Sequence, residues 1–279
     1  VYYMLSLKRS GLGSILRFCI CLVMANMAKG VGLAAAAAGG SCAVAFGITR
    51  LLAGPPLAPC SCPSEKKRRD TFDQLAPKWD STVRTDEFLA GIGRLRRRLV
   101  SRASGDVLEV SIGSGRNFSY YNPARVKSVT GVDFSRSMLE AADGKRSELQ
   151  PISLRLKLGT TQRLEFEDGA FDTVVDTFGI CSFERPVEGL REMRRVVKDG
   201  GQVLLLEHGA SSWELVQGFL NRTAASHVDR FGCYPNRKIL DLVEEAGLHP
   251  VVVERRHFGT TYFLVCKRHP PDPSSEDEE

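Results

Sequence analysis

Two short loops in this sequence pair glycines with carboxylates in a pattern that suits ligand binding. The first loop lies in VLEVSIGSGRN (residues 107–117). Gly113 and Gly115 permit backbone angles that are closed to other residues, and they allow a ligand to approach the chain closely. Glu109 ends the preceding apolar run with a carboxylate, which is suited to an ammonium group. A tight strand-to-helix turn is the plainer interpretation of the two glycines alone.

The second loop lies in GVDFSRSML (residues 131–139). Asp133 stands 18 positions beyond Gly115, where an acidic residue can accept hydrogen bonds from both hydroxyls of a ribose. Phe134 is then placed to stack on an adenine, and Ser135 to cap the next helix. A lone Asp at a strand end is more often a cap than a ligand, but its spacing from the glycine loop favours a nucleoside site.

A nicotinamide dinucleotide is the competing ligand. Its fingerprint expects a third small residue after the glycine pair, where a helix N-terminus meets the pyrophosphate. Here Gly115 is followed by Arg116, Asn117 and Phe118. The difference argues for a nucleoside ligand without pyrophosphate.

An alternation of strands and helices is needed to bring these loops together. Short apolar runs predict strands over residues 106–110, 128–132, 152–158, 172–176 and 202–207. Helical patterns cover residues 82–103, 135–147, 186–198, 213–227 and 237–246. In the first of these helices, Phe88, Ile92, Leu95 and Leu99 form an apolar face opposite an Arg-rich face that is interpreted as solvated. Asn236 and Gly247 are predicted to cap the last helix.

The expected fold is therefore α/β, with a doubly wound, mostly parallel seven-stranded sheet. Residues 250–258 and 260–268, joined by Gly259, predict a closing antiparallel hairpin. In such sheets, ligands bind beyond the carboxyl ends of the strands, where both loops lie. With 43% hydrophobic and 25% charged residues, the chain is not a disordered, collagen-like or disulfide-framework protein.

The ordered set VLEVSIGSGRN, GVDFSRSMLEAA, LEFEDGAFDTVVDTFGICSF and LREMRRVVKDGGQVLLLEHG resembles class I S-adenosylmethionine-dependent methyltransferases. Within them it is most similar to the quinone-biosynthesis branch and to small membrane-anchored methyltransferase-like proteins, some of them mitochondrial. The resemblance covers roughly residues 76–268. It implies a Rossmann-like methyltransferase domain that uses S-adenosylmethionine.

The resemblance also implies residue roles. The methionine moiety of the cofactor would be held by Glu109, Ser111, Gly113, Ser114 and Gly115. Asp133 would bind the ribose and Phe134 would lie beside the adenine, with Thr160 and Thr161 along the adenine edge. Asp176 and Thr177 would face the methionine end and the substrate. Two positions depart from the family pattern: Ser111 replaces a glycine, and Thr160 stands where many relatives have Asp.

Direct methyl transfer requires alignment of an acceptor and, for a phenol or carbon acid, a base. His208, after the run 202–207, is the best candidate base, although a purely structural role is also compatible with its position. Glu207 is a candidate to orient it. Cys181 and Cys233 are interpreted as small buried thiols, since direct transfer needs no covalent intermediate. No metal site is predicted: the pair Cys60 and Cys62 has no partner pair at ligand spacing.

The N-terminal part differs in charge from the rest. The first acidic residue is Glu65, so residues 1–64 carry five basic and no acidic side chains, and the net charge is +5. Such a segment is typical of mitochondrial targeting. We expect a targeting segment at 1–30, a membrane helix at 31–53, a proline-rich linker at 54–68, the methyltransferase domain at 69–269 and a disordered acidic tail at 270–279. A wholly cleaved targeting region and a low-complexity extension are the alternatives.

The predicted function is methyl transfer to a lipophilic small molecule, such as a quinone precursor or a thiol, or to a membrane-proximal protein. The predicted location is the mitochondrial inner membrane, with another organelle membrane as the alternative. A non-catalytic membrane scaffold that retains the fold is the competing function. A nucleic-acid acceptor is disfavoured, because residues 65–279 are neutral overall and lack a base-flipping motif. Leaving out the acidic tail raises the charge of residues 65–269 to +5, which softens this exclusion.

Overall fold

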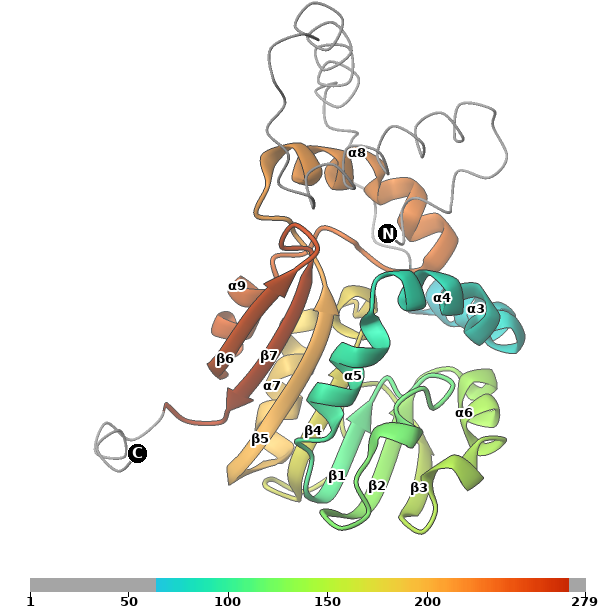
Figure 1. Cartoon of the computed structure of the whole chain (residues 1–279), viewed down its shortest axis with the longest axis vertical. Helices are drawn as coiled ribbons and strands as arrows, with labels where there is room; N and C mark the ends of the chain where they lie inside the picture. The colour runs from blue at the N-terminus through green and yellow to red at the C-terminus, as the bar shows by residue number, and fades with distance from the viewer. Residues whose placement is uncertain (1–63, 271–279) are drawn as a thin grey trace, which may run out of the picture.

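A computed structural model describes residues 64–270 of the chain (Figure 1). The predicted targeting segment at 1–30, the membrane helix at 31–53 and the acidic residues of the tail lie outside the described residues. Within residues 64–270, no helix combines the length and the apolar character needed to cross a bilayer.

A seven-stranded sheet forms the centre of the fold, in the order β3-β2-β1-β4-β5-β7-β6. The first five strands are parallel, and β7 runs antiparallel to both β5 and β6. This topology confirms the doubly wound sheet and its closing hairpin. The strands are β1 (Gly105–Val110), β2 (Val126–Asp133), β3 (Ser153–Leu158), β4 (Phe171–Thr177), β5 (Val197–His208), β6 (His249–Arg256) and β7 (Thr261–Lys267).

Helices cover both faces of the sheet, so that each face has its own apolar core. Because side chains alternate along a strand, Val174 enters the core under α7 (Pro186–Val196) and α9 (Ile239–Glu245). Its neighbour Val175 enters the opposite core under α5 (Ile92–Val100) and α6 (Arg136–Asp143). On β5, Leu205 enters the core under α7 and α9, and Leu204 enters the core under α5 and α6. The strands are therefore buried on both sides, as their continuous apolar runs predicted.

The long helix predicted over residues 82–103 is wrong, because the chain forms two helices there. Helix α4 (Trp79–Leu89) ends before Gly91, whose φ of 66° is left-handed, and α5 begins at Ile92. The turn between them removes Phe88 from the apolar face: its side chain is 82% exposed, whereas Ile92 and Leu99 are buried.

The predicted linker at 54–68 also ends too late. Helix α3 (Glu65–Leu75) begins at Glu65, with the Ser64 hydroxyl accepting a hydrogen bond from the Lys67 N–H at 3.3 Å. Arg68 is buried, donates to the Ser182 carbonyl and pairs with Glu184 at 2.8 Å. Residues 65–68 therefore pack as part of the folded domain.

The caps of the last helix follow the sequence prediction only at one end. The N-terminal flanking residue is Lys238, and Asn236 instead donates to Asn221 at 2.9 Å. At the other end Gly247 has a φ of 74°, and its N–H donates to the Glu244 carbonyl. This glycine ends the helix as predicted.

Three helices lie beyond the carboxyl ends of the parallel strands: α3, α4 and α8 (Glu214–Phe231) (Figure 1). Helix α3 is tied to the loop after β2, because Asp73 accepts hydrogen bonds from the Ser135 hydroxyl at 2.5 Å and the Ser137 N–H at 3.3 Å. Phe72 also meets the Phe134 ring edge-on, with centroids 5.6 Å apart. We refer to α3 and α4 together as the cover, since they lie over the loops that the sequence singled out.

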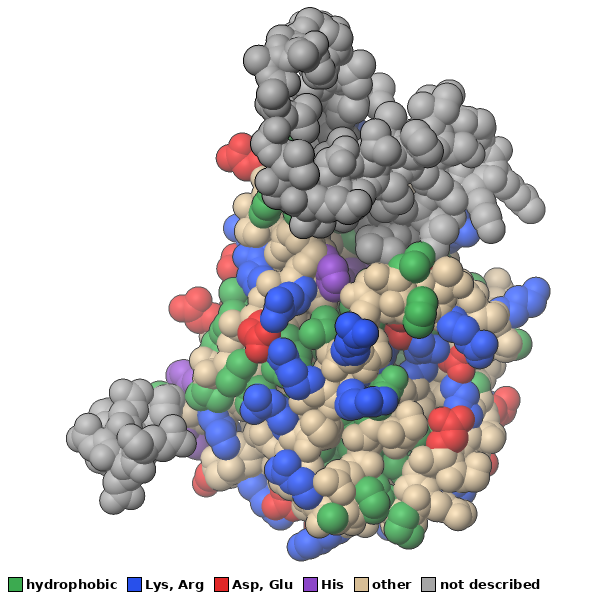
Figure 2. All heavy atoms as spheres, in the orientation of Figure 1, with side chains coloured by type: hydrophobic (Ala, Val, Ile, Leu, Met, Phe, Trp, Pro, Cys, Tyr) green, Lys and Arg blue, Asp and Glu red, His purple; other side chains and the backbone are tan. Residues whose placement is uncertain are grey.

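Basic side chains are spread over the face shown in Figure 2, among apolar, acidic and other polar groups. Several basic side chains of the domain are paired with carboxylates. Arg98 and Arg256, for example, both form ion pairs with Glu254. The described residues in this view form no separate basic stripe.

Candidate active site

The loop after β1 is strongly bent, and it uses left-handed backbone angles at three positions. The φ angles are 49° at Ser111, 55° at Gly113 and 74° at Gly115. A Cβ added to Gly115 would lie 2.5 Å from the Phe118 ring, so this glycine is required by packing inside the loop. Ser111 takes the left-handed conformation without being glycine, which costs on the order of 1–2 kcal/mol. Such strain is typically found at functional sites.

Asp133 joins the two loops that the sequence analysis coupled. Its buried carboxylate accepts hydrogen bonds from the Gly113 N–H and the Ser135 N–H, both at 2.9 Å. Burial raises the pKa of Asp133 to about 6, so the group is ionised near neutral pH. The Ser135 hydroxyl in turn accepts from the Met138 N–H at 3.1 Å, which confirms the predicted cap of α6.

A cavity opens between these loops and the cover, with about 630 Å³ of space that is free of protein atoms and partly open to solvent. Seven of the predicted site residues line it: Glu109, Ser111, Gly113, Ser114, Asp133, Phe134 and Thr177. From the cover come Phe72, Trp79 and Glu87.

The other predicted site residues lie outside this lining. Thr160 lines a neighbouring cavity with Arg163 and Phe166, and Thr161 is buried. Asp176 and Gly115 lie behind the lining residues, and His208 lies at the end of β5. The adenine-edge role of the two threonines stays a prediction.

Three buried carboxylates form an acidic floor beside the cavity: Glu109, Asp176 and Glu207. Glu109 accepts from the Asn117 amide at 2.8 Å and the Tyr121 hydroxyl at 2.6 Å, and burial raises its pKa to about 7. Burial and the carboxylate of Glu207 raise the pKa of Asp176 well above its usual range. A buried group of acids with raised pKa values is suited to a cationic ligand.

Two of these acids have unsatisfied oxygens. Both carboxylate oxygens of Asp176 are buried without a hydrogen-bond partner, as is one oxygen of Glu207. The other oxygen of Glu207 accepts from the Gly179 N–H at 3.2 Å. A Cβ at Gly179 would lie 2.2 Å from an Asp176 oxygen and 2.7 Å from the Ser111 hydroxyl, so only glycine fits there. Unpartnered buried oxygens of this kind are costly and require an explanation, such as a missing ligand.

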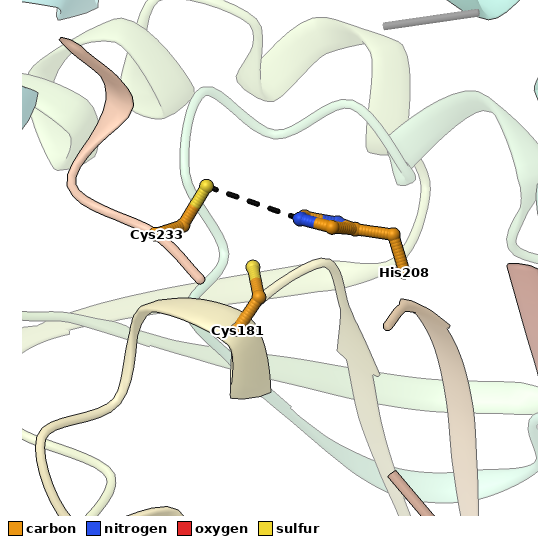
Figure 3. A group of neighbouring side chains, drawn as sticks. All are labelled: Cys181, His208 and Cys233. Atoms are coloured by element: carbon orange, nitrogen blue, oxygen red, sulfur yellow. Dashed lines mark hydrogen bonds between the residues drawn. The ribbon is translucent and has the colours of Figure 1, made fainter. Parts of the chain in front are cut away.

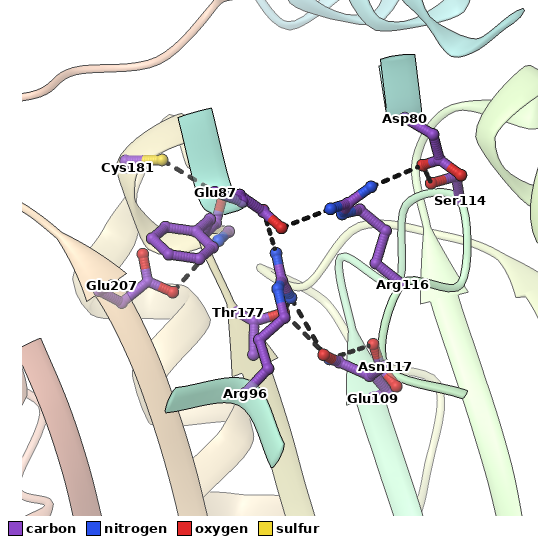
Figure 4. Close-up of polar contacts among 12 residues, drawn as sticks. Asp80, Glu87, Arg96, Glu109, Ser114, Arg116, Asn117, Thr177, Cys181 and Glu207 are labelled. Carbon is purple, nitrogen blue, oxygen red and sulfur yellow. Dashed lines mark hydrogen bonds and ion pairs between the residues drawn. The ribbon is translucent and has the colours of Figure 1, made fainter. Parts of the chain in front are cut away.

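Arg96 is a site residue that the sequence analysis missed. Its guanidinium is buried and donates to Asn117 Oδ1 at 3.0 Å, Thr177 Oγ1 at 2.7 Å and Glu87 Oε1 at 2.8 Å (Figure 4). The interpretation of the Arg-rich face as solvated is wrong at this position. The available signal was its spacing: Arg96 falls four residues after Ile92, on the apolar stripe itself.

Ion pairs also join the cover to the loop after β1. Arg116 contacts Asp80 at 3.2 Å and pairs with Glu87, while Asp80 accepts from the Ser114 hydroxyl at 2.6 Å (Figure 4). Lys145 of the segment after α6 pairs with Asp80 as well. The cover is therefore fastened to the cavity rim mainly through charges.

His208 stands on the other side of Phe178, which lines the cavity. The two ring centroids are 5.8 Å apart, and the Nε2 atom of His208 lies 3.9 Å from the Cys233 sulfur. Glu207 does not orient this ring, because adjacent residues of a strand point to opposite faces and its carboxylate bonds the Gly179 N–H. The role of His208 as a base stays a prediction.

Comparisons with known proteins agree on one family. The methyltransferase-domain family matches residues 108–205. The chain is 31% identical to "Methyltransferase OMS1, mitochondrial" of Saccharomyces cerevisiae over 219 residues, which cover 72% of this chain and 46% of the yeast protein. It is 32% identical to the demethylmenaquinone methyltransferase of Beutenbergia cavernae over 183 residues, 63% of this chain and 72% of that relative. The chain thus spans less than half the length of the yeast relative.

Solved structures share the fold at low sequence identity. Phosphoethanolamine N-methyltransferase 2 of Haemonchus contortus, in complex with S-adenosyl-L-methionine, superposes with a TM-score of 0.57 at 16% identity, covering 73% of this chain and 60% of that one. A methyltransferase bound to the Trm112 activator of Haloferax volcanii gives 0.56 at 16% identity, covering 71% of this chain and 98% of that one.

Proposed function

The chain belongs to the S-adenosylmethionine-dependent methyltransferases, and we propose that it transfers a methyl group from this cofactor directly to a lipophilic small molecule or a membrane-proximal protein. A quinone precursor or a thiol is the proposed small-molecule acceptor. The observation that carries the proposal is the cavity in which the bent loop after β1, the Asp133 carboxylate and the acidic floor meet.

The groups that line the cavity match the chemical groups of the proposed cofactor. The cofactor carries an ammonium and a sulfonium. Burial raises the pKa values of Asp176 and Glu109 in the cofactor-free protein, and a bound cation beside them would favour their ionised forms. Asp133 has oxygen lone pairs left for ribose hydroxyls beyond the two N–H groups it holds. Phe134 and Phe72 offer ring surfaces for the adenine.

The cofactor supplies an activated methyl group on its sulfonium, so the protein's task is alignment and exclusion of water. Gly113 lets the chain approach the ligand, and Asp133 fixes its sugar. The cover closes one side of the cavity through Asp80 and Glu87. The acceptor approaches past Thr177 and Phe178, and a phenol or carbon acid would give its proton to His208.

Calorimetry of the detergent-solubilised full chain tests cofactor binding. We expect S-adenosylmethionine to bind the wild type and Asp133→Asn to lose at least about tenfold in affinity, since charge-assisted bonds contribute about 1.5–3 kcal/mol each. Asp106→Asn is the matched control, because Asp106 lies at the opposite end of β1 and bonds Ser128. Absence of binding by the wild type at millimolar cofactor would contradict the proposal.

Transfer of a labelled methyl group tests the acceptor class. The purified chain is incubated with labelled cofactor and a mitochondrial membrane extract, which is then separated into lipid and protein fractions. Label in the organic phase supports a lipophilic small molecule, and label in protein supports a membrane-proximal protein. Binding of the cofactor with label in neither fraction would favour the scaffold alternative.

We further propose a mitochondrial inner-membrane location, with attachment through residues 31–53. The acid-free, basic residues 1–64 and the similarity to a relative named as mitochondrial support it. Carbonate extraction of isolated mitochondria should leave the full chain in the membrane pellet and release a variant in which residues 31–53 are deleted. Release of the full chain would contradict attachment through that segment.

A further inference from the structure

Three side chains from distant parts of the chain converge behind Phe178. Cys181 lies in the short helix η4 (Ile180–Ser182) after β4, His208 ends β5, and Cys233 follows α8. One ligand atom from each, a sulfur or a ring nitrogen, lies within 4.8 Å of the other two. Figure 3 shows the two sulfurs and the imidazole pointing towards one another.

Simple packing does not account for this arrangement. Cys266 is the reference: it is a buried free thiol on β7, surrounded by the apolar core under α7 and α9. Cys181 and Cys233 are free and buried too, but each turns its sulfur towards the other and towards a ring nitrogen. Direct methyl transfer uses no thiol nucleophile, so the proposed function leaves the pair unexplained.

The surrounding backbone holds these side chains in position. The Tyr234 N–H donates to the Cys181 carbonyl at 2.8 Å, which ties the loop after α8 to η4. Arg237 donates to the Ile180 carbonyl at 2.6 Å and fixes the same short helix. Gly232, with a φ of 70°, ends α8 and turns the chain so that Cys233 faces inward.

Each sulfur also has a partner outside this group of three, and for Cys181 it is the Phe178 carbonyl at 3.3 Å. The Nε2 atom of His227, a buried residue, lies 3.1 Å from the Cys233 sulfur. With its proton on Nε2, this ring would donate a hydrogen bond to a Cys233 thiolate. Outer-sphere contacts of this kind orient and stabilise the ligands of metal sites.

We propose that Cys181, His208 and Cys233 bind one zinc ion. Two thiolates and one imidazole are a ligand set that zinc prefers, at about 2.3 Å for sulfur and about 2.0 Å for nitrogen. The three ligand atoms lie within 4.8 Å of one another, and small side-chain rotations would place a zinc ion among them at these bond lengths. Binding releases the two thiol protons to solvent, and a water completes the tetrahedron.

The position of this site links it to the cavity. Phe178 lines the cavity, and the centroid of its ring lies 5.8 Å from that of His208. The zinc therefore stands at the rim where the acceptor is proposed to enter, and it holds the ends of β4, β5 and α8 together. With one ring nitrogen bound to zinc, only the other nitrogen of His208 is left for the role of base proposed above.

Zinc content of the purified full chain tests the site. We expect about one zinc per chain in the wild type and in Cys266→Ser, which is the matched control for loss of a buried thiol. The double variant Cys181→Ser/Cys233→Ser should hold less than a tenth of that amount. Equal zinc in the wild type and the double variant would overturn the proposal, as would equal loss in Cys266→Ser.

Cobalt substitution of the wild type gives a second measurement that does not depend on folding of a variant. The chain is stripped with a chelator and titrated with Co²⁺ alone. Saturation at one equivalent, with thiolate-to-cobalt charge-transfer bands and strong tetrahedral d–d bands, is expected, and His227→Gln should weaken binding about 10- to 100-fold. A spectrum without thiolate bands would overturn the proposal. Calorimetry with S-adenosylmethionine on the same samples reports cofactor binding separately, so either proposal can fail alone.

Discussion

The two halves of the sheet's carboxyl edge satisfy their buried acids in different ways. In the half after β1 and β2, Asp133 accepts from two backbone N–H groups, and Glu109 accepts from Asn117 and Tyr121. In the half after β4 and β5, Asp176 has no partner for either oxygen. The chain thus supplies well-formed hydrogen bonds to the acids of the first half, whereas the oxygens of Asp176 in the second half lack them.

Arg96 joins the two halves, so its loss should have the largest effect. It bonds Asn117 on one side and Thr177 on the other, and it pairs with Glu87 in the cover. We expect Arg96→Ala to lower the free energy of unfolding by about 3–5 kcal/mol, because Glu87 loses its closest buried partner. Urea denaturation measures the change. Arg97 is an exposed neighbour, so Arg97→Ala should change the free energy of unfolding by less than about 0.5 kcal/mol. Equal losses in the two variants would contradict a connecting role for the Arg96 hydrogen bonds.

Substitution of one acid in each half sharpens the comparison. Asp133→Asn should destabilise the cofactor-free protein by about 1–3 kcal/mol, because an amide cannot accept from both N–H groups on its two terminal atoms. Asp176→Asn should leave that stability nearly unchanged, because burial raises the pKa of Asp176 well above its usual range and the substitution then exchanges a neutral acid for a neutral amide. Thermal unfolding of both variants without cofactor measures the difference. Destabilisation of similar size at the two positions would remove the distinction between the halves.

The pH dependence of cofactor binding follows from Glu109, whose folded pKa is raised to about 7 from a usual value of 4.5. A cation binds the ionised form, so affinity for S-adenosylmethionine should rise about tenfold between pH 6 and pH 8. The cofactor-free fold holds the proton more tightly than the unfolded chain, so its stability should fall as pH rises from about 4.5 to 7. Calorimetry and thermal unfolding across this range measure both slopes. Glu109→Gln should flatten the slope of binding and reduce the slope of stability, to which the raised pKa of Asp133 also contributes. An unchanged binding profile in this variant would assign the titration to another group.

The smallest expected effect concerns backbone strain, which occurs once in each half. Ser111 has a φ of 49° after β1, and Phe178 has a φ of 62° after β4. Ser111→Gly should raise the free energy of unfolding by up to about 1 kcal/mol, since glycine adopts this angle without a steric cost. Urea denaturation measures the change, with Ser111→Ala as the control that keeps the strain. A gain of the same size in Ser111→Ala would assign the effect to the hydroxyl.

The first half was predictable from the sequence because its parts are local. Gly113 and Asp133 lie at the ends of two neighbouring parallel strands, so their spacing in the chain fixes their meeting in space. The second half depends on contacts between segments that lie far apart in the sequence. Cys233 reaches Cys181 only because α8 crosses back over the strand ends, and Arg96 turns inward because Gly91 breaks the helix before it.

The cover was hidden for a related reason. The sequence analysis did not single out Asp80 or Glu87, because their partners Ser114 and Arg116 lie about 30 residues further along the chain. Whether such a charged helix faces solvent or lines a site depends on the partners of its charged side chains, which its composition does not reveal.

The place where α3 begins has a mechanical consequence. The buried side chain of Arg68, near the start of α3 and so within the cover, donates a hydrogen bond to the carbonyl of Ser182, a residue that lines the cavity. Tension on the chain ahead of Ser64 would therefore be borne first by the contact that holds the cover shut. A pull on the proposed membrane attachment that was strong enough to break the Arg68 contact would therefore move the cover before it acted on the sheet.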